Sequence, residues 1–395
     1  MKMKVVAIKS IADVSSGNTP SRRKSEYWNG SIPWITTGEL ESGYVTASKE
    51  CVTEKALKET ALKLYHKGTV LIAMYGQGKT RGTAAVLGIE ATVNQACAAL
   101  TVHSGCSKFL FYQLQNSYHA IRRLSNTGNQ ENLNAEIIKN FKILWPDELE
   151  QQKIAAILST QDKVIELKEK LLAQKQQQKK YLMQQLLTGK KRLPGFGGEW
   201  KTIHLNEISC RNETKNTVGN NNVLTISAQY GLINQTEFFD KVIASDDKSN
   251  YYLLSKDEFA YNRSYSKGYP YGTIKRLKRY VQGVVSPLYI CFAVNKKLAS
   301  LDFLEQYFET SIINREIQSI VQEGARNHGM LNIAVDDFFR IKITMPETEE
   351  QKEIAKILRV ADHEIDLLQK SIEAEKQKKK ALMQLLLTGK VRVKI

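Results

Sequence analysis

Apolar residues recur with alternating steps of four and three in two stretches of the chain, one in its middle and one at its C-terminal end. This spacing is typical of a coiled-coil seam, in which a stripe of one helix faces a partner helix. The stripe residues are Ile154, Leu158, Ile165, Leu172, Leu182 and Leu186, followed by Ile354, Leu358, Ile365, Ile372, Leu382 and Leu386. Proline precedes each stretch (Pro146, Pro346) and glycine follows it (Gly189, Gly389), as at the two ends of a helix. We therefore predict two helices of about 40 residues, each roughly 60 Å long.

The two stretches are copies of each other. Residues 150–190 align without a gap with residues 350–390, at an offset of 200 residues, and roughly half of the aligned positions are identical. Chance does not produce such a match, so the chain is a tandem duplication. The first seam is imperfect, because polar side chains occupy four of its positions: Gln161, Lys168, Lys175 and Lys179.

A second apolar stripe runs beside the first seam, formed by Ile157, Val164, Leu167, Leu171 and Tyr181. It either offers a surface to the globular parts or to a partner, or forms one wide face buried within this chain. Both interpretations remain open at this point.

Each predicted helix follows a longer segment that is rich in β-branched and aromatic residues, with frequent Gly, Asn and Ser. Each such segment has the size of one domain. We predict an α+β protein with two mixed α/β globules in tandem, each followed by a long helix, and with pseudo-twofold symmetry. The predicted boundaries are 1–147, 148–195, 196–347 and 348–395.

The formal net charge of +16 favours a polyanionic partner, and nucleic acid is the commonest one in cytosol. The five cysteines are scattered and never spaced as C-x-x-C, which argues against a disulfide framework and a zinc site. No apolar run is long enough to span a bilayer, and the N-terminus lacks the apolar stretch of a signal peptide. We expect a cytoplasmic protein with no metal site.

One motif resembles a phosphate-binding loop, because residues 73–80 fit the form A-x-x-x-x-G-K-[ST]. Such a loop must open a helix, whose N-terminal N–H groups hold the anion. Here the following residues, 81–88, are glycine-flanked and β-branched and predict a second strand. We therefore interpret the segment as a hairpin loop that presents basic and amide side chains to DNA: Gln77, Lys79, Thr80 and Arg81.

The second globule has a stronger version of this segment, with basic residues interleaved with tyrosines and glycines. Its candidate DNA-binding residues are Arg263, Tyr265, Lys267, Tyr269, Tyr271, Lys275 and Arg276. A polar turn near the end of each globule adds Asn129 and Asn132 in the first, and Arg326 and Asn327 in the second. Solvated loops and ordinary turns are the alternative explanations.

No catalytic signature is present in the sequence. It contains no N/D-P-P-[YF] methyltransferase tetrad, no G-x-G-x-x-G fingerprint and no nuclease-like cluster of Asp, Glu and Lys. This favours a binding module without catalytic residues. An enzyme remains one alternative, and an adaptor whose globules bind protein through a coiled-coil frame remains another.

The chain resembles the specificity subunits of type I restriction–modification enzymes over essentially its whole length. The resemblance rests on Ser16-Gly17-Asn18-Thr19-Pro20-Ser21, Glu26-Tyr27-Trp28, Ile32-Pro33-Trp34-Ile35, Gly198-Glu199-Trp200-Lys201, the two E-Q-x-x-I-A-x-I-L helix starts and the two L-L-T-G-K ends.

This resemblance implies two target recognition domains, each of which reads one half of a bipartite DNA site. It also implies that the two helices pair as an antiparallel coiled coil that sets the spacing of the half-sites. Two modification subunits that use S-adenosylmethionine would dock on the helices and recognition domains, and restriction subunits that use ATP and Mg would join them. The chain itself would hold no cofactor. Because the two loops differ completely in sequence, the site should be asymmetric.

Overall fold

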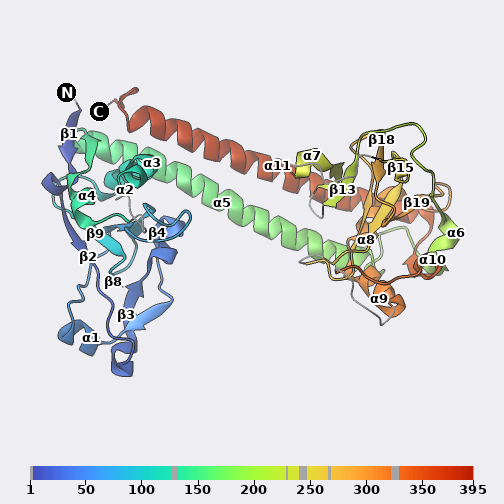
Figure 1. Ribbon diagram of the computed structural model, residues 1–395, viewed down its shortest axis with the longest axis horizontal. Helices are drawn as coiled ribbons and strands as arrows, with labels where there is room; N and C mark the ends of the chain where they lie inside the picture. Colours follow the sequence, from blue (N-terminus) through green and yellow to red (C-terminus); the bar gives the residue numbers. More distant parts are fainter. Residues whose placement is uncertain are drawn as a thin grey trace. The chain divides into compact units, whose positions relative to one another are not determined.

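The computed structural model describes residues 3–125, 132–227, 230–239, 247–265, 268–321 and 329–394. The chain forms two compact units: unit 1 comprises Met1–Lys170 with Lys370–Ile395, and unit 2 comprises Leu171–Gln369. Each unit contains a globular part and portions of two long helices (Figure 1). The division therefore falls inside the helices, whereas the boundaries predicted from the sequence follow the repeat.

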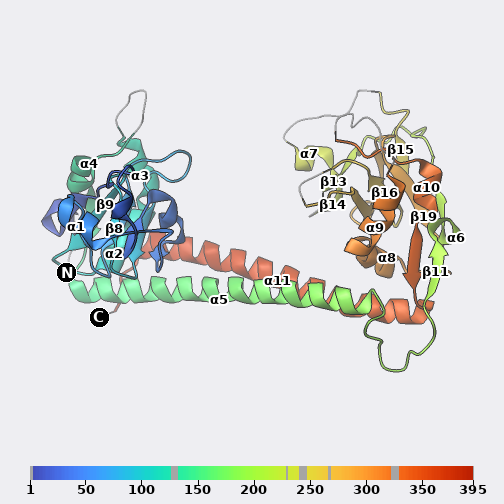
Figure 2. The ribbon, with the colours of Figure 1, turned by 90° about the horizontal axis from the view of Figure 1, so that it is seen from below.

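The main sheet of unit 1 has five strands, in the order β2 (Ala12–Ser16), β9 (Cys97–Val102), β6 (Val70–Ala73), β7 (Ala84–Leu87) and β4 (Tyr44–Val45). Neighbours are antiparallel except β4, which is parallel to β7. Strand β6 is buried on both faces: Val70 and Ile72 belong to one apolar core, whereas Leu71 and Ala73 belong to the other. This follows from the alternation of side chains along a strand. Helix α2 (Ser107–Asn116) lies between the sheet and the long helix of the unit (Figure 2).

A smaller sheet extends unit 1, with strands in the order β5 (Glu50–Val52), β3 (Trp28–Ile35) and β8 (Thr92–Val93). With helix α1 (Glu54–Glu59), it encloses a separate apolar core around Tyr27, Trp34 and Val52. The remaining elements of the unit's globular part are β1 (Lys4–Ala7), which pairs with β10 (Lys142–Trp145), the helices α3 (Tyr118–Arg123) and α4 (Ala135–Asn140), and 3-10 turns at Ile8–Ser10, Ser25–Tyr27 and Thr37–Ser42.

Unit 2 repeats the central part of this architecture. Its main sheet has the order β12 (Ser209–Arg211), β19 (Ile290–Val294), β16 (Phe259–Asn262) and β17 (Thr273–Arg276), all antiparallel. Its other elements are β11 (Lys201–His204) paired with β20 (Lys342–Met345), β13 (Leu224–Ser227) with β14 (Gly231–Asn234), β15 (Tyr252–Ser255) with β18 (Gln282–Val285), and the helices α6 (Leu205–Ile208), α7 (Gln235–Phe238), α8 (Leu301–Phe308), α9 (Ser311–Ile320) and α10 (Val335–Phe339). The order β2-β9-β6-β7 thus matches β12-β19-β16-β17, which shows that the duplication includes the globular parts.

Aromatic rings dominate the core of unit 2. Phe259 and Phe292 stack at 5.3 Å between ring centroids, and Tyr261 stacks on Phe338 at 4.8 Å. All four side chains are fully buried. Offset stacking of rings adds to the stabilisation that burial of their area already provides.

The two long helices are α5 (Glu148–Leu186) and α11 (Thr348–Leu386), each of 39 residues. Both begin two residues after the prolines that were predicted to precede them. The C-cap prediction is also confirmed, because Gly189 and Gly389 have φ angles of +69° and +71°, which favour glycine.

The helices complete the globular cores. Leu158 of α5, together with Leu386 and Leu387 at the end of α11, lies in the core of unit 1. Likewise, Leu358 of α11 lies in the core of unit 2, together with Leu186 and Leu187 at the end of α5. Each globular part is therefore built on the start of the helix that follows it and on the end of the other helix.

The predicted antiparallel coiled coil is confirmed within each unit. In unit 1, Asp162 bonds to Lys379 and Lys168 to Ser371, so residue numbers rise along α5 as they fall along α11. Unit 2 has the same direction, since Lys175 pairs with Glu364 and Lys179 with Asp362. The predicted seam residues are buried or half-buried in both helices: Ile154, Leu158, Ile165, Leu172, Leu182, Leu186, Ile354, Leu358, Ile365, Ile372, Leu382 and Leu386. Most of the second stripe is exposed, with Ile157, Leu167, Leu171 and Tyr181 at 39–58%.

A buried carboxylate fixes the start of each helix to the segment after the end of the other. Glu350 is 1% exposed and accepts two bonds from Arg192, at 2.8 and 2.7 Å. Glu150 is fully buried and accepts the equivalent pair of bonds from Arg392. A carboxylate that leaves water must be paired in this way, because an uncompensated buried charge is strongly destabilising.

We predict that Leu358→Ala destabilises unit 2 by about 2–5 kcal/mol, because it removes a fully buried side chain and leaves a cavity. Leu367→Ala, on the same helix but 51% exposed, is the matched control and should change the free energy of unfolding by less than about 0.5 kcal/mol. Chemical denaturation followed by tryptophan fluorescence measures both. Equal effects of the two substitutions would contradict the placement of the start of α11 inside the core.

Candidate nucleic-acid interface

The two basic loops predicted from the sequence occupy equivalent positions in the two units. In unit 1, residues 74–83 connect β6 to β7, whose antiparallel pairing confirms the predicted second strand. In unit 2, residues 263–272 connect β16 to β17, the corresponding strands of the second sheet. We call these loop 1 and loop 2. Loop 1 leads into a strand and not into a helix, so it lacks the helix N-terminus on which a phosphate-binding loop depends.

A second segment lies beside each loop. The Leu133 backbone N–H donates to the Met74 carbonyl of loop 1, at 3.0 Å. The Leu331 N–H donates equivalently to the Arg263 carbonyl of loop 2, at 2.9 Å. These backbone bonds place Leu133 and Leu331, which lie at the end of or just after the predicted polar turns, beside the loops. Of the turn candidates, Asn132 is half-buried beside Leu133; Asn129, Arg326 and Asn327 fall outside the described residues.

Loop 1 exposes some of its predicted side chains and hides others. Gln77 and Lys79 are exposed, and Thr80 is half-buried. Arg81 is only 8% exposed, so its side chain is buried in the globular part and is not presented at the surface. The loop backbone is held by Tyr118, whose hydroxyl donates to the Lys79 carbonyl at 2.7 Å. The amide and ammonium groups of the loop tip therefore project from a fixed backbone.

Arg122 also holds loop 1, because its guanidinium donates to the Arg81 carbonyl at 2.7 Å. Its side chain lies against Gly82, whose φ of +83° requires glycine. One exposed residue of this loop escaped the sequence analysis: Tyr75, at 38% exposure, next to Gly76. An aromatic residue beside a basic loop tip is the signal that would have found it.

Loop 2 has the same length but is more tyrosine-rich, and its arginine side chain turns inward. The Arg263 guanidinium donates to the carbonyls of Leu288 and Ile333, both at 3.2 Å. Tyr271 packs against the core of unit 2 and is half-buried. Tyr265 is 63% exposed and Tyr269 is half-buried; Lys267 falls outside the described residues.

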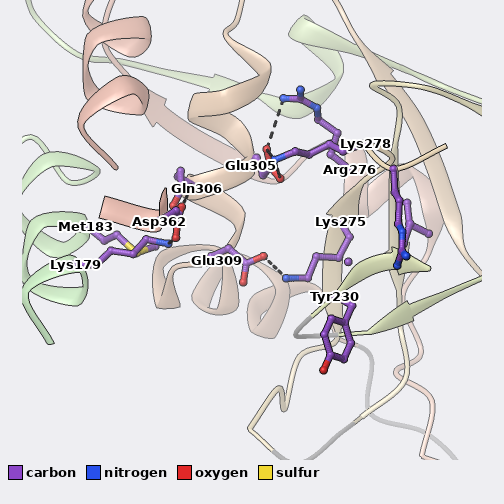
Figure 3. Close-up of a pocket in the computed structure, with 13 residues that line it drawn as sticks. Lys179, Met183, Tyr230, Lys275, Arg276, Lys278, Glu305, Gln306, Glu309 and Asp362 are labelled. Carbon is purple, nitrogen blue, oxygen red and sulfur yellow. Dashed lines mark hydrogen bonds and ion pairs between the residues drawn. The ribbon is translucent and has the colours of Figure 1, made fainter. Parts of the chain in front are cut away.

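The two basic residues that follow loop 2 are engaged by carboxylates. Lys275 pairs with Glu309, and Arg276 pairs with Asp302 at 2.8 Å and with Asp257 at 3.1 Å. Both basic side chains are 12% exposed. Figure 3 shows the Lys275 side chain directed toward Glu309. These ion pairs favour a structural role for Lys275 and Arg276, and their contact with DNA stays a prediction.

A groove of about 550 Å³ lies between the globular part of unit 2 and its helices. Figure 3 shows the side chains that line it. Asp362 of α11 accepts from Gln306 of α8 at 2.7 Å and pairs with Lys179 of α5 at 2.6 Å. Through Asp362, the side chains that line this groove connect α8 of the globular part to both long helices.

Unit 1 has the equivalent groove, of about 620 Å³. There Tyr112 of α2 donates to Asp162 at 2.7 Å, and Lys379 of α11 pairs with the same carboxylate at 2.6 Å. Burial, reinforced by the Asp162 charge, raises the pKa of Tyr112, so the phenol stays protonated as the donor. Among the residues that the structure describes, no three His, Cys, Asp or Glu side chains gather as a metal would require.

Comparison with known proteins agrees with this geometry. Residues 1–177 match the family model described as "Type I restriction modification DNA specificity domain". The MjaIX specificity subunit of Methanocaldococcus jannaschii is 34% identical over 172 residues, 42% of this chain and 39% of the relative. The MjaVIII specificity subunit of the same organism is 22% identical over 99% of this chain and 93% of its own length. The chain is thus similar to type I restriction specificity subunits, through a matched domain at residues 1–177 and a relative aligned over nearly its whole length.

Two other relatives extend the comparison. The EcoR124I/EcoR124II specificity subunit of Escherichia coli is 29% identical over 37% of each chain. The matches to it and to the MjaIX subunit thus span about two fifths of those relatives. A crystal structure of the S subunit from M. genitalium shares the fold, with a TM-score of 0.60 and 14% identity over 98% of this chain and 96% of that one. The resemblance noted in the sequence is thereby confirmed.

Within this specificity-subunit fold, the motifs that carried the resemblance have structural roles. Gly17 lies so close to the backbone of Val93 and Asn94 that an added Cβ would approach their carbonyl oxygens to 2.1 and 2.3 Å. Trp200 packs against Gly189 at the end of α5. No helix in the described ranges combines the length and apolarity needed to cross a bilayer.

We predict that Arg276→Ala lowers the stability of unit 2 by about 1.5–3 kcal/mol, because it removes ion pairs with two carboxylates and leaves these with less compensation. Lys79→Ala, at an exposed loop tip, should change stability by less than about 0.5 kcal/mol. Differential scanning calorimetry of the two variants distinguishes a structural cation from a surface one. An unchanged melting profile for Arg276→Ala would contradict the structural role.

Proposed function

We propose that this chain is the DNA-reading subunit of a type I restriction–modification complex, and that loops 1 and 2 each read one half of an asymmetric bipartite site. The observation that carries the proposal is the pair of equivalent hairpin loops with unrelated sequences on one duplicated frame. Because loops 1 and 2 follow equivalent strands, each is placed in the same way on the sheet of its own unit. Because their side chains are unrelated, they would prefer different bases. The net charge of +16 supports binding to a polyanion.

Two kinds of contact are expected from the exposed side chains. Gln77 can pair with adenine through its amide, and Lys79 can bind guanine or a phosphate. Tyr265 offers an exposed ring and hydroxyl to the DNA surface. Phosphate contacts would orient each globular part, whereas base contacts would carry the sequence preference.

The proposed partners are two modification subunits, which dock on the helices and recognition domains, and the restriction subunits that join them. The exposed apolar stripe of α5, which includes Ile157, Leu167 and Tyr181, supports docking on the helices, since exposed apolar patches mark interaction sites. In this proposal S-adenosylmethionine, ATP and Mg bind to the partner subunits, and this chain holds no cofactor and catalyses no reaction. The complex acts in the cytoplasm.

Exchange of residues 1–147 for the first domain of another family member should change one half-site and leave the other intact. The reason is that the second loop and its supporting strands lie in unit 2 and are untouched. Methylome sequencing of cells that carry the exchanged chain with its modification subunits measures both half-sites at once. A change in both half-sites, or in neither, would show that the two loops are not independent readers.

Lys79→Ala should weaken DNA binding, because it removes an exposed ammonium from the tip of loop 1. If Lys79 contacts a phosphate, all duplexes are affected alike and the slope of log K against log salt falls by about 1; if it contacts a base, the loss is about 1–3 kcal/mol at one position. Fluorescence anisotropy at several salt concentrations, with the chain bound to its modification subunits, measures the effect. Lys163→Ala, at an exposed lysine of α5, is the control. Unchanged affinity of the Lys79 variant would remove loop 1 from the interface.

A further inference from the structure

The polar contacts between the α5 and α11 segments are of two kinds: some are repeated in both copies of the duplication, and others occur in one copy only. Some are the same in both copies: Asp162 pairs with Lys379, and Asp362, its equivalent, pairs with Lys179. The pair Glu150–Arg392 and its equivalent Glu350–Arg192 behave likewise. Because both copies carry the same residues there, these pairs would form equally well if α5 paired with a second α5.

Other contacts differ between the copies. In unit 1, Glu375 of α11 is bonded by two side chains of α5: Lys168 at 2.8 Å and Gln161 at 2.7 Å. Lys168 also donates to Ser371, at 2.7 Å. Glu375 and Lys168 are 20% and 28% exposed, so solvent screens their interaction only in part. The bond from Lys168, reinforced by that from Gln161, lowers the pKa of Glu375 and keeps it charged.

The residue of α5 that is equivalent to Glu375 has the opposite charge. It is Lys175, which pairs in unit 2 with Glu364 of α11, at 2.8 Å. The repeat thus places a lysine in one helix and a glutamate in the other at the same seam position. Each of the two forms an ion pair with the other helix: Lys175 with Glu364, and Glu375 with Lys168.

We infer that two ion pairs, Lys175 with Glu364 and Glu375 with Lys168, make α5 pair with α11. The same charges exclude pairing of either helix with its own copy in a second chain. In an α5–α5 pair of the same register, Lys175 of one chain would take the place of Glu375 and face Lys168 of the other, twice by symmetry. In an α11–α11 pair, Glu375 would take the place of Lys175 and face Glu364, also twice.

Like charges that face each other across a coiled-coil seam are unfavourable, and single polar positions are known to set partner choice in coiled coils. Solvent screens Lys175 and Glu364, which are 35% and 50% exposed, more than it screens Lys168 and Glu375. The residues that replace Gln161 and Lys168 in α11 strengthen the effect, because they are Ala361 and Leu368 and offer no hydrogen bond to Glu375. The apolar seam residues cannot make this choice, since they are apolar in both copies. Partner choice therefore depends on the charged positions where the copies differ.

The test exchanges the two charges in the full chain. The variant Lys175→Glu with Glu375→Lys keeps composition and net charge, but in the α5–α11 pair like charges then meet at Lys168 and at Glu364, while both same-helix pairs become complementary. We expect wild-type chain to be monomeric, and the double variant to form dimers with a Tm lower by about 5 °C or more. Light scattering after size-exclusion chromatography and calorimetry measure mass and Tm.

A fourfold variant supplies the matched control. Adding Lys168→Glu and Glu364→Lys to the double exchange restores opposite charges between α5 and α11, and it should restore the monomer and the wild-type Tm. A double variant that stays monomeric overturns the inference, whatever its Tm. A fourfold variant that does not return to the monomer also overturns it, because the defect would then not lie in charge pairing. If the double variant cannot be purified, recovery of a monomer with the wild-type Tm in the fourfold variant supports the inference. A fourfold variant that also cannot be purified overturns it.

Discussion

Closure of each globular core by the end of the other repeat's helix is the constraint on which the structure depends. Leu387 lies in the core of unit 1, and Leu187 lies in the core of unit 2. The Gln113 side chain adds a specific bond, because its amide donates to the Leu387 carbonyl at 3.0 Å from a buried position. A globular part without the opposite helix end would expose this apolar surface and leave its buried glutamate, Glu150 or Glu350, without an arginine. The two repeats therefore depend on each other for stability.

The two long helices were the most predictable part of the chain. Their signals are local and repeated: the seam spacing, Pro146 before α5 and Gly189 after it, and a second copy of each at the 200-residue offset. Local periodicity determines helix position because every turn of a helix buries the same stripe. The second stripe was ambiguous from sequence, since periodicity does not distinguish a surface for a partner from a buried face. In the structure most of this stripe is exposed, so it does not form one wide face buried within the chain.

The candidate interface was predictable in its placement and less so in its side chains. The strand-like segments on the two sides of loop 1 identified a hairpin, but the partners of the basic residues lie far away in the sequence. Arg276 meets Asp302 of α8, and Arg263 donates to the Ile333 carbonyl, 70 residues away. A basic residue in a loop sequence carries no sign of whether a distant carboxylate or carbonyl will engage it. Sequence therefore identifies a basic loop without separating cations that stabilise the fold from those that remain on the surface, such as Lys79.

The way each loop is anchored suggests how such readers can change without loss of the fold. Loop 1 is held through backbone groups: the Met74 carbonyl accepts from Leu133, and the carbonyls of Lys79 and Arg81 accept from Tyr118 and Arg122. Backbone carbonyls are present whatever the side chain, so these bonds place few demands on the identity of the loop residues. Loop 2 uses the same device, since the Arg263 carbonyl accepts from Leu331 although its sequence is unrelated to that of loop 1. The frame is thus specified by the residues that donate to the loops, and the exposed loop positions are left open to vary in sequence.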